Sequence, residues 1–331
     1  MSKTIILVHG RHFKPAESVL TKNWTEALRH GIQRDEPNAV EAFDAARIEM
    51  IYYGDVSNEY LSRVVRERYD ENNDIEDRKL CLDELKTYRK SQFSERTYRR
   101  LPGASRWREG LADIFAGPLS ILGLSDRAIN MVAPDMAEYW DDATAFGSRV
   151  RAPMVRPLIE AFERNDEICV IAHSLGSLIA YDTFWKFSHM SEYRGSISPD
   201  LDFEGKVIDL WITIGSPLSD ETVKRNLKGS GNTDIRRYPT NIRRWINFAA
   251  EDDFISHDEQ LANDYEGMIT LGPGRTSSGR LKKSRTKISD VRMYNLSVRG
   301  RTSNDAKSNP HHGTGYLISP QVAKAVAEWV S

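Results

Sequence analysis

Ser174 occupies a position from which a serine can act as a nucleophile. Residues 167–187 read EICVIAHSLGSLIAYDTFWKF, in which one apolar run predicts a buried strand and the next predicts a helix. A tight turn between a strand and a helix lifts the serine oxygen above the edge of a sheet. Such a turn needs small residues two positions before and after the serine, and Ala172 and Gly176 are small. The amide of Leu175, at the start of the helix, would then point at a developing oxyanion.

Three other segments place polar side chains or a glycine directly after predicted strands. They are LVHG (7–10), FAAEDDFI (248–255) with Asp252 and Asp253, and NPHHGTGYLISP (309–320) with His311 and His312. Taken singly, they are typical of a strand end, of an acidic turn and of a surface histidine pair or incidental metal ligand. Taken with Ser174, they gather at one edge, because a parallel sheet binds its ligands beyond the carboxyl ends of its strands.

Strands and helices alternate along most of the chain. The predicted strands are 4–10, 47–55, 167–174, 205–218, a segment within 241–255, and 289–298. The predicted helices are 24–32, 152–165, 176–187 and 319–330, the last with Ser319 as its N-cap and Pro320 at its first position. This alternation predicts an α/β fold in which helices cover both faces of a mostly parallel sheet. The Gly/Ser-rich, basic segment 272–287 predicts an exposed, mobile loop.

The pentapeptide 172–176, AHSLG, resembles the G-x-S-x-G nucleophile elbow of the α/β-hydrolase superfamily of serine esterases and lipases. Alanine stands in place of the first glycine, a mild departure. The resemblance covers 1–56 and about 138–331, and the segment ITIGSPL (212–218) adds to it. It implies an α/β-hydrolase fold.

The resemblance also implies a catalytic triad in the chain order Ser, Asp, His. In that family the acid follows a late strand and precedes an apolar residue, which favours Asp253, with Asp252 as the alternate. The histidine lies in the loop before the last helix, a few residues ahead of an aromatic. The shorter spacing to the following tyrosine favours His312, with His311 as the alternate. The expected triad is therefore Ser174, Asp253 and His312.

The same resemblance implies an oxyanion hole. Its donors would be the amide of Leu175 and an amide of the loop after the first strand, at Gly10 and Arg11. Hydrolase chemistry of this kind needs no metal, and we expect no cofactor. The spacing His9-x-x-His12 has no carboxylate or third histidine near it in sequence, so it does not predict a metal site.

Composition excludes several other classes of protein. The chain has 331 residues, a formal net charge of −2 and two cysteines. This balance favours neither nucleic acid nor an anionic membrane as a partner, and two cysteines form neither a disulfide framework nor a CxxC metal pattern. The N-terminus MSKTIILVHG lacks the features of a signal peptide, so we expect a cytoplasmic protein.

Residues 57–137 interrupt the alternation. We interpret the chain as a single α/β-hydrolase domain, 1–331, in which 57–137 form a helical insertion or cap. Its part 57–110 is highly charged, which predicts solvated helices. The part 111–133 is apolar but broken by glycine and proline, too interrupted for a membrane span. It is expected either to pack on the charged helices or to form a lid that lines an acyl pocket above Ser174.

The sequence predicts a serine hydrolase that cleaves a carboxylic ester through an acyl-enzyme. The ester preference follows from the resemblance, and the expected substrate is a small acyl ester, lipid-like esters included. The alternative is a non-catalytic protein of the same fold that presents its charged segment 57–110 to a protein partner. That alternative predicts an occluded or misaligned triad.

Overall fold

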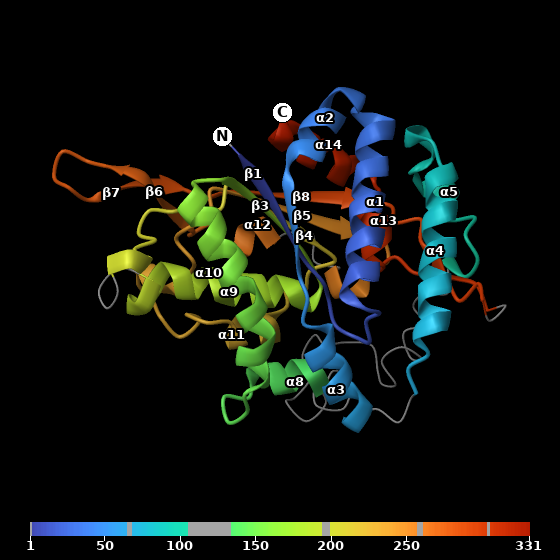
Figure 1. The fold of residues 1–331 in the computed structure, drawn as a ribbon, viewed down its shortest axis with the longest axis horizontal. Coiled ribbons are helices and arrows are strands. Elements are labelled where there is room, and N and C mark those ends of the chain that lie inside the picture. Colours follow the sequence, from blue (N-terminus) through green and yellow to red (C-terminus); the bar gives the residue numbers. More distant parts are fainter. Residues whose placement is uncertain (1, 65–67, 105–133, 194–198, 257–260, 303–304) are drawn as a thin grey trace.

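A computed structural model describes residues 2–64, 68–104, 134–193, 199–256, 261–302 and 305–331. Within these residues six strands form one parallel sheet in the order β2-β1-β3-β4-β5-β8 (Figure 1). They are β1 (Lys3–Val8), β2 (Arg47–Ile51), β3 (Glu167–His173), β4 (Leu210–Ile214), β5 (Arg244–Ala250) and β8 (Lys287–Met293). The predicted α/β class and parallel sheet are confirmed.

Helices cover both faces of this sheet. Figure 1 shows α1 (Glu17–Asp35) and α4 (Glu71–Thr87) on one side, and α9 (Phe146–Arg164) and α10 (Leu175–His189) on the other. The alternation of side chains along a strand explains the two layers. In β1, Ile5 and Leu7 belong to the apolar cluster that contains α1, whereas Ile6 and Val8 belong to the cluster that contains α10.

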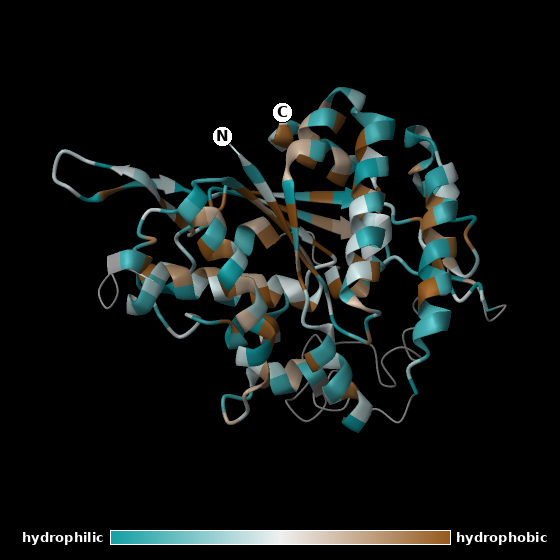
Figure 2. Cartoon of the chain, in the orientation of Figure 1, coloured by the Kyte–Doolittle hydropathy of each residue, from teal (hydrophilic) through white to brown (hydrophobic). Residues whose placement is uncertain are grey.

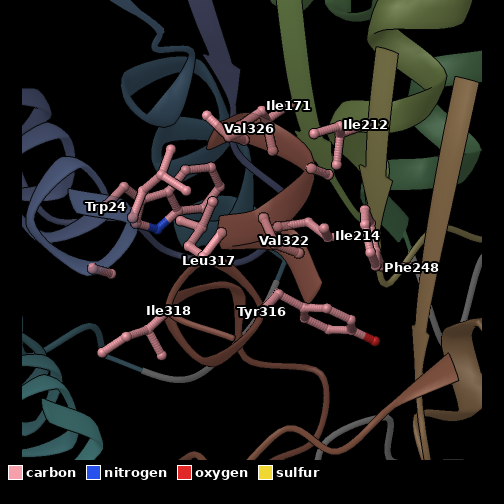
Figure 3. Packing of buried hydrophobic residues seen from close by; sticks show 14 of the residues in the cluster. Trp24, Ile171, Ile212, Ile214, Phe248, Tyr316, Leu317, Ile318, Val322 and Val326 are labelled. Carbon is pink, nitrogen blue, oxygen red and sulfur yellow. The ribbon is translucent and has the colours of Figure 1, made fainter. Parts of the chain in front are cut away.

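The first of these clusters joins the sheet to the last helix, α14 (Pro320–Val330). Figure 3 shows Trp24 of α1 and Val322 and Val326 of α14 beside Ile171 and Ile212 of the sheet, and all of them are buried. Burial of one such side chain contributes about 1.5–3 kcal/mol. The hydropathy colouring of Figure 2 shows the same concentration of apolar residues on the central strands. The expected cap holds, since the Ser319 side chain accepts from the Val322 amide.

Shorter elements connect these layers. They are α2 (Val40–Ala45), α3 (Gly54–Val64), α5 (Glu95–Tyr98), α8 (Pro134–Trp140), α11 (Glu221–Asn226), α12 (Leu261–Asp264), α13 (Gly313–Leu317), and two short antiparallel pairs, β6 (Ile269–Arg275) with β7 (Leu281–Arg285) and β9 (Val298–Arg299) with β10 (Lys307–Ser308). Nothing among the described helices is long and apolar enough to cross a membrane.

The described parts of the segment 57–137 are mostly helical. It supplies most of α3, all of α4 and α5, and most of α8. Helix α4 packs against α1 and α13, so this part of the segment joins the face of the sheet that α1 covers. The proposed lid, 111–133, lies outside the described residues.

Several predicted bounds are wrong. The strand predicted over 205–218 covers only Leu210–Ile214, and the strand predicted over 289–298 ends at Met293. The segment 272–287 is not a loop but most of the β6–β7 hairpin, which stands out from the body in Figure 1, followed by the start of β8. Its glycines predicted a loop, yet they serve the hairpin, because Gly274 and Gly279 adopt positive φ at the irregularity in the ladder and at the turn. The strand predicted over 47–55 ends at Ile51, and α3 already begins at Gly54.

The connections of β1 identify the edge where a ligand would bind. The chain leaves β1 for β2 on one side and returns through β3 on the other side. In an open parallel sheet this reversal opens a crevice beyond the carboxyl ends of the two strands. Gly10 follows the end of β1, and Ser174 follows the end of β3.

Candidate active site

Ser174 lies on a strained turn between β3 and α10. Its backbone has φ 54° and ψ −126°, a conformation that a residue with a side chain rarely adopts. The strain is maintained by close packing, because a Cβ at Gly176 would lie 2.7 Å from the Val8 carbonyl oxygen. Ala172 is buried between β1 and β4, so alanine is accommodated where the elbow pattern has glycine.

The loop after β1 passes directly against this turn. A Cβ at Gly10 would lie 2.8 Å from the Cβ of Ser174. Leu175 is the first residue of α10, so its N–H has no acceptor within the helix. The Arg11 guanidinium turns to Asp135 of α8, with 2.7 Å between Nη2 and Oδ1. The expected donors at Gly10, Arg11 and Leu175 are therefore in the segments that flank Ser174.

His311 makes the contact with Ser174. Its Nε2 lies 3.0 Å from Ser174 Oγ, and its Nδ1 lies 2.9 Å from Asp253 Oδ2 and 3.0 Å from Oδ1. A carboxylate only accepts hydrogen bonds, so Nδ1–H of His311 donates to Asp253. In the neutral ring Nε2 then accepts from the Ser174 hydroxyl. This is the arrangement in which a histidine can take the serine proton.

Asp253 accepts two further hydrogen bonds. The Tyr316 hydroxyl donates to Oδ2 at 2.6 Å, and the Ile255 amide donates to Oδ1 at 3.0 Å. Burial and the neighbouring carboxylate raise the pKa of Tyr316 well above its usual value, so the hydroxyl stays protonated and keeps donating. Gly215 has φ +56°, and a Cβ there would lie 3.0 Å from both Asp253 Oδ2 and His311 Nδ1. The pair therefore has little room to move.

His312, the histidine that the sequence favoured for the triad, does not contact Ser174. His312 is extended, so its side chain points away from that of its neighbour. Its Nε2 accepts from Arg299 Nη1 at 2.9 Å, and its Nδ1 lies 3.9 Å from Cys81 Sγ. Burial, with Arg299 beside it, lowers the pKa of His312 well below its usual value. The alternate acid, Asp252, lies elsewhere and accepts from the Tyr98 hydroxyl at 3.1 Å.

Several supporting residues were not assigned from the sequence. Asn295 Nδ2 donates to the carbonyls of Pro310 (2.8 Å) and His312 (2.9 Å), and His173 Nε2–H donates to the carbonyl of His311 at 2.8 Å. These bonds fix the loop that carries His311. Gly215, in ITIGSPL, and His173, in AHSLG, belong to motifs that the sequence analysis had already noted. No pattern in the sequence singled out Asn295.

Two other histidines near Ser174 are neutral. Burial lowers the pKa of His9 and of His173 well below the usual value. His9 uses both ring nitrogens within the fold, accepting from the Tyr53 amide at 3.1 Å and contacting the Gly10 carbonyl at 2.8 Å. Among the described residues no group of three metal-binding side chains is close enough to hold an ion.

A cavity of about 400 Å³ opens beside Ser174 and His311. The loop 11–14 forms one side of it, α4 another, and residues 299–302 a third. Trp24 and Leu20 of α1 add an apolar patch to the lining. The cavity is large enough for a small acyl group next to the serine oxygen.

Comparison of the chain with family models, with curated proteins and with solved structures found no match.

Proposed function

We propose that the protein is a serine hydrolase of the α/β-hydrolase fold that cleaves a carboxylic ester. One observation carries the proposal: Ser174 Oγ, the His311 ring and the Asp253 carboxylate are joined by contacts of 3.0 Å and 2.9 Å. Three polar groups from distant parts of the chain rarely meet in this order unless proton transfer depends on it.

The proposed reaction has two halves. Ser174 Oγ attacks the acyl carbonyl carbon while its proton passes to His311 Nε2, and the amides at Leu175 and in the Gly10–Arg11 loop stabilise the oxyanion. The bond to the alcohol oxygen then breaks, and His311 returns the proton to the leaving alcohol. Water cleaves the acyl-enzyme by the same path, with His311 as the base, and Ser174 is regenerated.

The site supports the fold assignment in three ways. Ser174 lies on a strained turn from strand to helix, as a nucleophile elbow requires. The chain order is Ser174, Asp253, His311, which is the order typical of that fold. The cavity adjoins the switch point between β1 and β3. The ester preference rests on the resemblance of the elbow to those of esterases and lipases.

The alternative, a non-catalytic protein-interaction module, expects a triad that is misaligned or occluded. The contact between Ser174 and His311 and the adjoining cavity do not favour it. We therefore propose that the charged helices of the 57–110 segment help to enclose the active site and do not serve mainly to bind a protein partner.

Hydrolysis of p-nitrophenyl butyrate tests the proposal. We expect turnover by the native protein and a loss of about 10⁴–10⁶ in kcat for Ser174→Ala. Ser177→Ala is the matched control, because Ser177 lies on the same helix, is buried and donates only to the Ala172 carbonyl at 3.3 Å. Equal turnover by the native protein and Ser174→Ala would contradict the proposal.

A further inference from the structure

The cavity beside Ser174 has an unusually charged lining for a site expected to hold an acyl chain. Among the described residues, four cationic residues and two acidic residues line it. The cations are Arg11, Lys14, Arg78 and Arg299, and the carboxylates are Asp74 and Asp77. An uncharged chain placed here would displace water from these groups without replacing its hydrogen bonds, which is unfavourable.

Both carboxylates are already fully engaged. Asp74 accepts from Arg78 Nε at 2.7 Å, from Arg299 Nη2 at 2.6 Å and from the Tyr69 hydroxyl at 3.1 Å. Asp77 accepts from Arg299 Nε and from the amides of Gly300 (3.1 Å) and Arg301 (2.9 Å). The two acids therefore balance Arg78 and Arg299, and Arg11 pairs with Asp135 of α8. Among the described residues, this leaves no carboxylate for Lys14, the fourth cation of the lining.

Lys14 is that remaining cation. The residue lines the cavity and is only 7% exposed. Its ammonium donates to the backbone carbonyls of Arg11, His12 (3.1 Å) and Phe13 (3.4 Å), all within its own loop. Among the described residues, no carboxylate lies within ion-pair distance of Lys14. Carbonyl dipoles satisfy its donors but do not neutralise its charge.

Asn58 of α3 holds the backbone of Lys14 in place from outside the cavity. The Lys14 amide donates to Asn58 Oδ1 at 2.9 Å, and Asn58 Nδ2 donates to the Lys14 carbonyl at 2.8 Å. Burial, then the positive charge of Arg78, lower the pKa of Lys14 to about 7, although Asp74 and Asp135 oppose this. A cation held this way at neutral pH gains from an anion that enters the cavity.

We infer that the part of the ester substrate that occupies this cavity carries an anionic oxygen group, a carboxylate or a phosphate, that pairs with Lys14. The inference rests on the proposed function and specifies the substrate class of that site. An anion beside Lys14 completes the charge balance of the lining. Neutral, lipid-like acyl groups would lack this pairing.

A matched pair of substrates tests the inference. p-Nitrophenyl butyrate and the p-nitrophenyl monoester of succinate differ chiefly in a terminal methyl against a carboxylate, and the monoester of 3-phosphonopropionate supplies the phosphate-like arm. Rates over the Ser174→Ala background remove self-hydrolysis by the substrate's own carboxylate. We expect kcat/KM for one anionic ester to exceed that of the butyrate about tenfold or more. The better of the two anionic esters identifies the group.

The variant Lys14→Met tests whether the Lys14 ammonium causes the preference for the anionic ester. The ratio of anionic to neutral kcat/KM should fall to about one in Lys14→Met and stay at the native value in Lys22→Met, since Lys22 is exposed on α1. A butyrate that is cleaved as well as both anionic esters would overturn the inference and leave the hydrolase proposal standing. So would a ratio that Lys14→Met does not change, because Lys14 would then only close its loop.

A binding measurement keeps the inference testable without turnover. Succinate and inorganic phosphate are titrated separately into Ser174→Ala, and at least one of them should raise Tm progressively as its concentration exceeds its Kd. The rise should be absent when Lys14→Met is added to that variant. A protein that hydrolyses no ester but shows this Lys14-dependent shift would contradict the proposed function and support the anion site. No shift with either anion would overturn the anion site.

Discussion

The two sides of the cavity are built in different ways. Ser174, Asp253 and His311 lie at strand ends or in a loop pinned by backbone contacts, so the sheet itself sets their positions. The opposite side, here called the charged wall, is lined by Lys14, Asp74, Asp77, Arg78 and Arg299. It depends on ion pairs between side chains far apart in sequence, such as Arg299 with Asp77, 222 residues away. If the proposed function holds, we expect the reactive side to respond sharply to single-atom changes, and the charged wall to govern stability and substrate choice.

The largest expected effect separates the two adjacent histidines. His311→Ala should lower kcat about 10⁴–10⁶, because it removes the base that takes the Ser174 proton. His312→Ala removes a contact with Arg299 on the charged wall and should keep most of the activity at temperatures where the variant is folded. Steady-state kinetics on folded protein measures both. Equal losses would contradict the division into two sides.

The next effect tests the acid. Asp253→Asn keeps the shape of the side chain but favours the wrong tautomer of His311, so kcat should fall about 10⁴. Asp252→Asn is the control, since that carboxylate accepts from the Tyr98 hydroxyl and does not contact His311. If Asp252→Asn were the more damaging change, the acid would be misassigned.

The charged wall should show its effect in stability. Asp77→Asn removes the buried negative charge that pairs with Arg299, together with one of the two oxygens that accept from Arg299 and two backbone amides. Breaking one partner of a buried ion pair costs about 3–5 kcal/mol in the free energy of unfolding. Urea denaturation measures this, with Asp83→Asn, exposed on the same helix, as the control. A loss no larger than that of the control would show that the wall is not held by these pairs.

The smallest effect is a dependence on pH. Lys14 is charged below its pKa of about 7 and neutral above it, so the preference for the anionic ester should weaken as pH rises through about 7. Arg78 and Asp74 of α4, Asp135 of α8 and Arg11 of its own loop are the charges that face it. Using the ratio of two substrates cancels any dependence on pH that both substrates share. A ratio that stays constant from pH 6 to pH 9 would exclude Lys14 as the selective group.

The sequence predicts the reactive side far better than the charged wall. Apolar runs mark the strands because a parallel sheet is buried on both faces, and the small residues around Ser174 report a local steric need. His311 and His312 are chemically identical neighbours, and only the backbone direction decides which one contacts Ser174. Local patterns carry no information on that direction.

The ion pairs of the charged wall could not be predicted from the sequence, for a different reason. The charges of 57–110 are typical of solvated helices, yet Asp77 is buried because Arg299 and two amides from the far end of the chain satisfy it. Lys14 was likewise one cation among many in the sequence. Only the assembled loop and the cavity distinguish it from surface lysines. Pairings across more than 200 residues leave no periodicity to read.

Covalent labelling with a fluorophosphonate, followed by peptide mapping, tests the central claim most directly. The account predicts one modified residue, Ser174, and a strong loss of labelling in His311→Ala, because the hydroxyl then has no base to accept its proton. Labelling should persist in Ser177→Ala. A native, folded protein that remains unlabelled at Ser174, or that labels equally well without His311, would contradict the account.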